Sequence, residues 1–379
     1  MTSNHLTMLL IWTLSLLIIS CSAEENSEQI QDISDVPILE IQQTLNITED
    51  DNIFFSLIGG MVVTDSEKNV FVADRGQKQI FVFDDNGNLI DSFGREGSGP
   101  GEFRGIQSIF TSFQNDTLYV YDRQALRISL FHNTDGDWEY SRTIIFKDIE
   151  SPFQQPGNLI PIPGEGFILE QTIFYVFGGA EDINQYPLTK IDLGGQWSDE
   201  KLFSIPLDEI AVYRESGAIQ GINLLPFGRK SILKDGPDGT LFHNWSDQLN
   251  IHQLNTAGDT LATYSFALPN PPVKNEEKQR WIDAHIESMH QMLRERIPDT
   301  KPVVEDFFID EEQRIWVNIH DEIIDRFNWL IFNQNGAIKG GFKLPTNLTV
   351  SDVRYGSLFG SLEDEESGEL SVAVYEVKF

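Results

Sequence analysis

Residues 69–93 read NVFVADRGQKQIFVFDDNGNLIDSF, and this stretch decides the fold. It contains three short apolar runs, rich in β-branched and aromatic residues, which is typical of half-buried strands. Asn86 and Gly87 lie between the second and third runs and tolerate the positive φ of a tight hairpin turn. A further apolar run, residues 57–63, precedes them across a polar turn. The stretch therefore predicts a four-stranded antiparallel meander.

The same unit recurs along the chain at intervals expected for propeller blades. The second strands align as NVFVADR from residue 69, TLYVYDR from 117, GFILEQ from 166, TLFHNWS from 240 and RIWVNIH from 314. Third and fourth strand patterns follow each of them, and turns are expected at Gly87, Gly136, Gly258 and Gly336. Agreement across strands and turns identifies five copies of one unit.

The C-terminal segment supplies a sixth copy that is one strand short. Residues 348–379 contain three strand patterns, whereas residues 36–47 (VPILEIQQTLNI) form a strand pattern before the first copy. That early strand can fill the outer position of the last blade, which removes exposed sheet edges. We therefore predict an all-β fold, a six-bladed β-propeller over residues 36–379, closed by its N-terminal strand. With its edges closed, the ring is expected to be a monomer.

Composition and charge exclude some classes of protein and some kinds of partner. The chain has 379 residues, of which 40% are hydrophobic and 11% aromatic, as expected for a folded protein. Its formal net charge of −32 repels phosphate backbones, so nucleic acid is not an expected partner. The single cysteine, Cys21, excludes an intramolecular disulfide.

The N-terminal segment has the pattern of an export signal. Residues 6–19 (LTMLLIWTLSLLII) are apolar and uncharged, but they are shorter than the roughly 20 residues of a spanning helix. The following IISC, residues 18–21, resembles a bacterial lipobox, which implies lipid attachment at Cys21. We expect a signal peptide over residues 1–20, a flexible acidic tether over residues 21–35, and a membrane partner reached through the lipid.

The repeat pattern resembles the NHL-repeat-like six-bladed β-propellers, in particular bacterial lipoproteins of that fold. The best match is residues 59–104, where VFVADRGQKQIFVFDDNG and GREGSGPGEF reproduce the family pattern almost intact. Later blades diverge, because GSGPGEF occurs once and the Asp74 position becomes Trp245 or Ile319. The resemblance implies a bacterial cell-envelope protein, lipid-anchored at the outer membrane and either periplasmic or surface-exposed.

One face of the ring is expected to carry the long connections. In a four-stranded up-and-down blade, the second-to-third connection and the blade-to-blade connection emerge on the same face. All the long connections are of these kinds: residues 94–105, 173–186, 206–229 and 269–302. We call this side the loop-rich face and the opposite side the short-turn face.

Four arginines belong to the loop-rich face by the same parity: Arg75, Arg95, Arg104 and Arg123. Guanidinium groups read carboxylates and sulfates in bidentate fashion, so these residues are candidate ligand-binding side chains. Asp74 and Asp122 precede two of them, and local pairing of Asp with Arg at strand ends is the structural alternative.

Residues 274–297, between blades four and five, have a helical pattern. Ile282, Ile286, Met289 and Leu293 recur at spacings of three and four and predict one apolar stripe. The helix could pack on the rim of the ring or form a lid beside the channel mouth.

Catalytic and metal-binding signals are weak. The histidines are scattered without ligand spacing, so no catalytic residue, metal ligand or cofactor is assigned. Asp306 and Asp352 are candidate channel carboxylates, although a one-residue slip in register would turn them away from the channel.

These patterns favour a non-enzymatic binding or protein-interaction module that holds an envelope protein, peptide or glycan on its loop-rich face. The alternative is a metal-dependent envelope hydrolase or lyase with a calcium or zinc site in the central channel.

Overall fold

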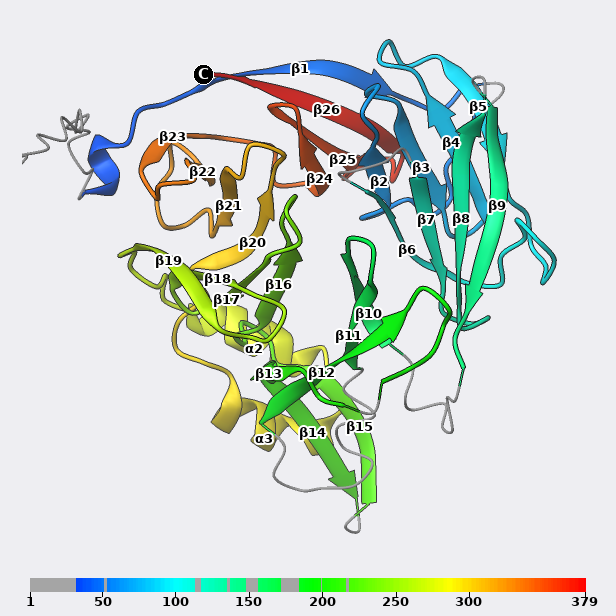
Figure 1. Ribbon diagram of the computed structural model, residues 1–379. Coiled ribbons are helices and arrows are strands. Elements are labelled where there is room, and N and C mark those ends of the chain that lie inside the picture. The colour runs from blue at the N-terminus through cyan, green and yellow to red at the C-terminus, as the bar shows by residue number, and fades with distance from the viewer. Residues whose placement is uncertain are drawn as a thin grey trace, which may run out of the picture.

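The computed structural model describes residues 32–50, 53–112, 117–134, 137–147, 156–171, 184–198, 200–215 and 218–379. Over these residues the repeats form six four-stranded antiparallel sheets arranged around one axis, with an added two-stranded sheet (Figure 1). The predicted six-bladed propeller is therefore confirmed.

Blades 1 to 3 follow the chain from the inner to the outer strand. Blade 1 contains β2 (Val62–Thr64), β3 (Val70–Asp74), β4 (Gln79–Phe83) and β5 (Leu89–Phe93). Blade 2 contains β6 (Ile106–Thr111), β7 (Thr117–Asp122), β8 (Arg127–Thr134) and β9 (Asp137–Ile145). Blade 3 contains β10 (Pro156–Ile162), β11 (Gly166–Gln171), β12 (Gln185–Asp192) and β13 (Phe203–Pro206).

Blades 4 and 5 repeat this order, and blade 6 combines both ends of the chain. Blade 4 contains β16 (Ser231–Asp235), β17 (Leu241–Trp245), β18 (Leu249–Leu254) and β19 (Thr260–Phe266). Blade 5 contains β20 (Val304–Ile309), β21 (Ile315–Ile319), β22 (Trp329–Phe332) and β23 (Ile338–Phe342). Blade 6 contains β24 (Leu348–Arg354), β25 (Ser357–Glu363), β26 (Leu370–Lys378) and β1 (Glu40–Ile47).

The core lies between adjacent blades. All five residues of β3 are buried, because both faces of the sheet are covered by neighbouring blades. Phe71 and Ala73 pack in one cluster with Leu118 of blade 2, whereas Val70 and Val72 pack with Val372 of blade 6. The middle strands therefore have nearly continuous apolar runs.

The ring closes as predicted. The first strand, β1, pairs antiparallel with the last, β26, from Glu40 opposite Lys378 to Ile47 opposite Val372. Figure 1 shows the two strands side by side at the edge of blade 6.

The turn glycines behave as the sequence predicts wherever the structure describes them. Gly87, Gly258 and Gly336 have φ values of 83°, 89° and 81°. Gly136 lies outside the described residues.

The segment before β1 is held on blade 5. Residues Ile33–Asp35 form a short 3₁₀ helix, η1. The Arg326 guanidinium donates hydrogen bonds to the carbonyl oxygens of Ile33, Ser34 and Val36 at 2.8, 2.6 and 2.9 Å. The last four residues of the predicted tether, 32–35, therefore pack on the ring. The predicted signal peptide and Cys21 lie outside the described residues.

The insertion between blades 4 and 5 is helical but broken. It contains α2 (Asn275–Asp283) and α3 (Glu287–Arg296). The predicted single stripe is wrong at Ile286, which precedes α3 as its N-cap and exposes 60% of its surface, whereas Ile282, Met289 and Leu293 are buried. No helix in the described part of the chain is long and apolar enough to span a membrane.

The sequence reading missed a hairpin between blades 3 and 4. Strands β14 (Ile210–Glu215) and β15 (Ala218–Leu224) form the two-stranded sheet. Ala211 and Leu225 pack with Ile282, Met289 and Leu293 in a separate apolar cluster. The helices therefore cover this hairpin, and together these elements form an insertion platform, residues 210–215, 218–224 and 275–296, beside blades 3 and 4 (Figure 1).

Candidate functional site

Backbone hydrogen bonds fix the predicted loop-rich face. In blades 1, 2, 4 and 5, the end of the second strand bonds the segment that enters the same blade. These bonds are Arg75 N to Leu57 O, Arg123 N to Gly105 O, Ser246 N to Lys230 O and His320 N to Val303 O, at 2.9–3.1 Å. The second-to-third connections and the blade-to-blade connections thus meet on one face, which holds all four predicted arginines.

The repeated aspartate before Arg75 and Arg123 organises these connections. Asp74 accepts hydrogen bonds from Ser56 N and Ser56 Oγ, both at 2.6 Å, and from Gly76 N at 2.8 Å. Asp122 accepts from Arg104 N at 2.8 Å and Gly105 N at 3.0 Å. In both blades, the carboxylate therefore joins the turn after the second strand to the loop that enters the blade.

The environment of Asp74 favours its charged form. Burial raises the pKa of this carboxyl, but hydrogen bonds from Ser56 and Gln77 outweigh burial and hold its pKa below the usual value. In blade 4, Ser246 takes over the equivalent contact and accepts a hydrogen bond from Lys230 N at 2.9 Å.

The GREGSGPGEF loop, residues 94–103, folds around one carboxylate. Glu102 Oε2 accepts a hydrogen bond from Gly99 N at 2.8 Å, and Glu102 Oε1 accepts from Arg95 Nε and Nη2 at 2.9 and 2.7 Å. The Gly99 hydrogen bond, followed by the Arg95 hydrogen bond, lowers the pKa of Glu102. Gly97 approaches this side chain so closely that a Cβ would collide with its carboxyl group.

Arg127 anchors the same loop from β8, and the sequence reading missed it. Its guanidinium donates to Ser98 O at 2.9 Å and Glu102 O at 2.5 Å, and it lies 3.8 Å from Asp122 Oδ2. The loop is thus tied to blade 2 through a mostly buried cation.

The four predicted arginines differ in how they are used. Arg95 is ion-paired with Glu102, although 79% of its side chain is exposed. Arg104 is exposed, and the Nε atoms of Arg75 and Arg123 are buried without a hydrogen-bond partner among the described residues. The structure brings Arg104 next to Arg123 through the Arg123 N to Gly105 O bond, and Arg75 holds the equivalent place in blade 1. Among the described residues, an anion could therefore reach Arg104 without displacing an acidic partner, whereas at Arg95 it would have to displace Glu102.

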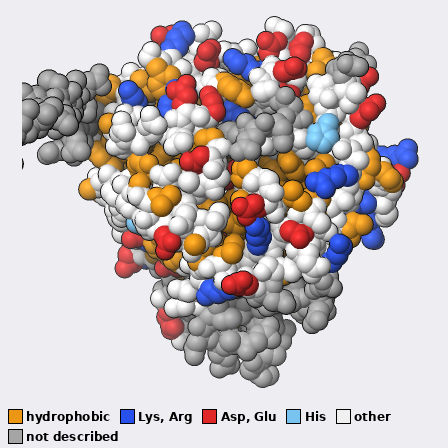
Figure 2. Space-filling model, viewed as in Figure 1, with side chains coloured by type: hydrophobic (Ala, Val, Ile, Leu, Met, Phe, Trp, Pro, Cys, Tyr) orange, Lys and Arg blue, Asp and Glu red, His pale blue; other side chains and the backbone are white. Residues whose placement is uncertain are grey.

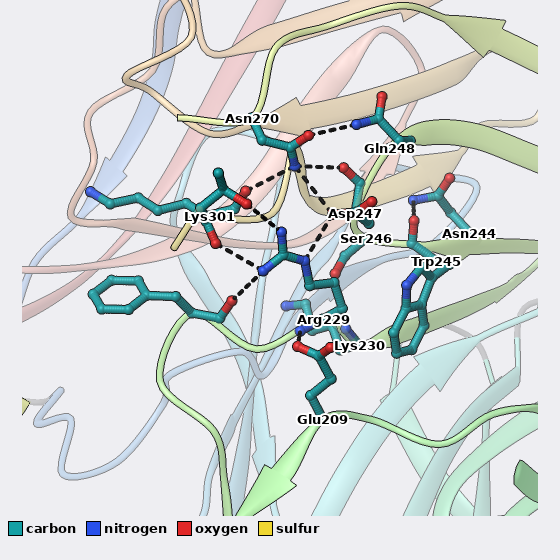
Figure 3. A network of polar contacts seen from close by, with 12 residues as sticks. Glu209, Arg229, Lys230, Asn244, Trp245, Ser246, Asp247, Gln248, Asn270 and Lys301 are labelled. Atoms are coloured by element: carbon teal, nitrogen blue, oxygen red, sulfur yellow. Dashed lines mark hydrogen bonds and ion pairs between the residues drawn. The ribbon is translucent and has the colours of Figure 1, made fainter. Parts of the chain in front are cut away.

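A polar network centred on Arg229 joins the long connections of blades 3, 4 and 5 to one another (Figure 3). Arg229 Nε donates to Asp247 Oδ1 at 2.8 Å, and its Nη1 and Nη2 donate to Thr300 O and Thr300 Oγ1 at 2.8 and 2.6 Å. Asn270 Nδ2 donates to Asp247 O at 2.9 Å and Lys301 O at 3.0 Å. One mostly buried guanidinium thus connects segments 71 residues apart in sequence.

Lys301 extends the network to the insertion platform. Its buried ammonium group lies 2.7 Å from Glu277 Oε1 on α2 and 2.9 Å from Glu322 Oε2 on blade 5. Burial lowers the pKa of Lys301, but the hydrogen bonds to Glu277 and Glu322 outweigh burial and raise it. The ammonium group therefore fixes α2 against the ring.

The two channel carboxylates are engaged by cations. Asp306 on inner strand β20 lies 3.0 Å from Lys234 Nζ on β16. Asp352 on β24 accepts a hydrogen bond from Thr64 N at 3.0 Å and lies 3.5 Å from Arg354 Nε. Lys234 and Asp352 line a small cavity of about 140 Å³ between inner strands. A metal ion bound to either carboxylate would have to displace one of these cations.

Ser231 and His243 are in contact, but not as a nucleophile and base. His243 Nε2 lies 3.1 Å from Ser231 Oγ, and Ser231 Oγ donates to Pro206 O at 2.7 Å. Because the hydroxyl proton points to a carbonyl, the imidazole donates to the serine oxygen rather than accepting its proton. Burial lowers the pKa of His243 to about 4, so the ring is neutral near pH 7. Among residues that the structure describes, no three His, Cys, Asp or Glu side chains gather closely enough to hold a metal ion.

Known proteins resemble this chain in fold. A family described as a six-bladed β-propeller matches residues 19–156, somewhat over a third of the chain. A Bacteroides fragilis protein that is assumed to be exported superposes with a TM-score of 0.53 at 12% identity, covering 92% of this chain and 97% of its own. A member of the DUF4221 family from Bacteroides vulgatus superposes with a TM-score of 0.56 at 12% identity, covering 90% of this chain and 99% of its own. No curated protein matches the sequence.

These likenesses agree with the sheet topology. The chain is a six-bladed β-propeller, and both of these solved structures come from Bacteroides species. At 12% identity the likeness extends to the fold alone.

Proposed function

We propose that this protein is a lipid-anchored cell-envelope propeller that binds an envelope protein, peptide or glycan on its loop-rich face. The observation that carries the proposal is the insertion platform, which belongs to none of the six four-stranded sheets. The platform has its own apolar cluster and is held by Arg229 and Lys301, so its surface is pre-organised rather than mobile.

The exposed side chains of the platform favour contact with a macromolecule. Leu224, Trp281 and Ile286 expose 60%, 45% and 60% of their surfaces. Aromatic and aliphatic side chains on a rigid support are the usual anchors of a binding interface. Arg75, Arg104 and Arg123 on the same face add groups that suit acidic parts of a ligand.

The envelope location rests on the N-terminal sequence and on the fold. Residues 18–21 resemble a lipobox, and one relative of similar fold is assumed to be exported. A Cys21→Ser variant should therefore lose incorporation of labelled palmitate and appear in the soluble fraction. Retention of label and membrane association would overturn the lipid anchor.

The binding proposal can be tested by native pull-down from solubilised membranes. A Trp281→Ser and Ile286→Ser double variant should lose at least about tenfold of the co-purifying partner, because about 1.4 kcal/mol of lost contact is tenfold in affinity. Leu261→Ser, on the outer strand of blade 4, is the matched control, since Leu261 is also largely exposed. Equal recovery with both variants would overturn binding through the platform.

The alternative is a metal-dependent hydrolase or lyase at the central channel, for which Asp306 and Asp352 on the inner strands provide carboxylates. Thermal-shift titrations with calcium and zinc separate the two functions. Tight stoichiometric binding that Asp352→Asn abolishes would support the enzyme, and no shift would support the binding module.

A further inference from the structure

A cleft on the short-turn face has features of a small-molecule site. Inner strands of neighbouring blades make close contact at five of the six junctions, and the junction of β6 with β10 is the exception. A cleft of about 250 Å³ occupies this region, with walls from blades 2, 3 and 4. We call it the blade 2–3 cleft. It lies on the side opposite the insertion platform, since its lining includes the first turns of blades 3 and 4 at Gly164 and Gly236.

The apolar wall of the cleft is rigid and aromatic. The Tyr119 ring stacks on Phe110 with centroids 5.1 Å apart and meets the edge of Phe167 at 5.8 Å. Tyr119, Phe167, Leu130 and Ile162 line the cleft from strands of blades 2 and 3. A flat apolar group could stack here without reordering the wall.

Hydrogen-bonding groups share the cleft with this wall. His132 Nδ1 lies 3.0 Å from Thr117 Oγ1, which orients the imidazole at the cleft. Tyr119 also lines the cleft, and its hydroxyl forms no hydrogen bond with another described residue. Both groups can therefore bond a ligand.

One cation borders the cleft. The side chain of Arg142, on outer strand β9, forms no ion pair or hydrogen bond with any described residue. Its charge acts on Tyr119: burial raises the pKa of the phenol, and Arg142 opposes that rise. A guanidinium without an acidic partner among the described residues, next to a phenol and an imidazole, forms a receptor for a carboxylate.

We propose that the blade 2–3 cleft binds a small monocarboxylate that carries a flat apolar group. The carboxylate pairs with Arg142, and the apolar group lies against Tyr119 and Phe167. Asp235 also lines the cleft, and burial raises its pKa, which favours its neutral form. Arg142 is the one guanidinium among the described residues that line the cleft, so a second carboxylate would be desolvated without a cation, and dianions should bind more weakly than monoanions.

The site can be tested with 3-phenylpropionate as the probe, by calorimetry or ligand-observed NMR on the full-length protein. Arg142→Ala should weaken binding about tenfold to a hundredfold, the range for losing a hydrogen bond to a charged group. Arg142→Lys should recover part of the loss. The neutral analogue 3-phenylpropanol, the dianion phenylsuccinate and acetate should each bind the unmodified protein at least about tenfold more weakly.

Lys339→Ala is the matched control, because Lys339 is also an exposed cation on an outer strand, β23 of blade 5. It should leave probe binding unchanged. Equal affinity for the acid and the alcohol, full binding by Arg142→Ala, or equal loss in Lys339→Ala would overturn the proposal. Each outcome is independent of the platform, because the pull-down variants Trp281→Ser and Ile286→Ser leave the cleft intact.

Discussion

The carboxylate of Asp74 joins the loops at the start of the ring. The Asp74 side chain is buried and accepts hydrogen bonds from Ser56, Gly76 and Gln77. Asp74→Ala should lower the free energy of unfolding by roughly 2–4 kcal/mol, because several buried donors lose their acceptor. Urea unfolding followed by tryptophan fluorescence measures this change.

Asp84 provides the control for Asp74, since it accepts similar hydrogen bonds from Asn86 and Asn88 in an exposed turn. Asp84→Ala should lower the free energy of unfolding much less than Asp74→Ala does, because water replaces the lost partner. Equal destabilisation by the two substitutions would show that the buried donors at Asp74 find other acceptors.

The charge of Asp74 also predicts a pH dependence. Its pKa in the folded protein lies below that of an unfolded aspartate, about 3.9, so its contribution is fully present above that value and is lost as the pH falls through the folded pKa. The stability difference between the unmodified protein and Asp74→Asn should be constant above about pH 5 and shrink below about pH 4. A difference that grows in acid would contradict this assignment.

Single residues also show how far the sequence can be read. The repeated Asp–Arg pair predicted correctly that Arg75 and Arg123 lie on the loop-rich face, because the pair recurs at the end of each of these second strands. Arg229 and Lys301 carried no such signal. Their partners are distant in sequence, and Thr300 lies 71 residues from Arg229. Which carboxylate neutralises which cation depends on loop paths that local patterns do not encode.

Among the elements, α2 depends on one ammonium group. Lys301 is 3% exposed and contacts Glu277 and Glu322. Lys301→Met should cost roughly 3–5 kcal/mol, because it removes the buried cation between Glu277 and Glu322 and leaves the pair with only Lys274, whose side chain is 62% exposed. It should also increase amide exchange in α2 and α3 before blade 5 is affected.

Lys278→Met is the matched control, because Lys278 pairs with Asp299, whose side chain is 96% exposed. This change should cost less than about 1 kcal/mol. A triple variant, Lys301→Met with Glu277→Gln and Glu322→Gln, should recover part of the stability that Lys301→Met loses. No recovery would assign the loss to the contact of the Lys301 ammonium group with the Phe227 ring rather than to its ion pairs with the two carboxylates.

The elements that the sequence reading missed share one physical cause. The hairpin β14–β15 and the break between α2 and α3 lie in insertions that follow no blade period. Helical spacing placed Ile286 on the apolar stripe, but the chain turns at that residue so that α3 can cover Ala211 and Leu225. Tertiary packing therefore decided these boundaries.

At the scale of the whole molecule, the closure of the ring could be predicted from the sequence. The last copy of the repeat lacks one strand, and the strand pattern at residues 36–47 belongs to no other copy. The pairing of β1 with β26 covers an edge that would otherwise expose unpaired amide and carbonyl groups. Two further contacts tie it: Ile41 packs in the cluster of blades 5 and 6, and Lys378 pairs with Glu40 at the ring surface. We therefore expect the other five blades to fold without the pairing of β1 with β26.

A chain that begins at residue 49 should consequently fold as an open ring with reduced stability. The loss should be on the order of 5 kcal/mol, since each ladder hydrogen bond contributes about 1 kcal/mol. The truncated protein should associate in a concentration-dependent manner through the free edge of β26, which size-exclusion chromatography with light scattering measures.

A synthetic peptide of residues 36–48 should restore both the monomer and the unfolding temperature by strand addition. The same peptide with Ile41→Asp and Leu45→Asp should not, because both side chains pack against buried clusters. A truncated protein that stays monomeric and gains nothing from the peptide would show that β1 is dispensable for closing the ring.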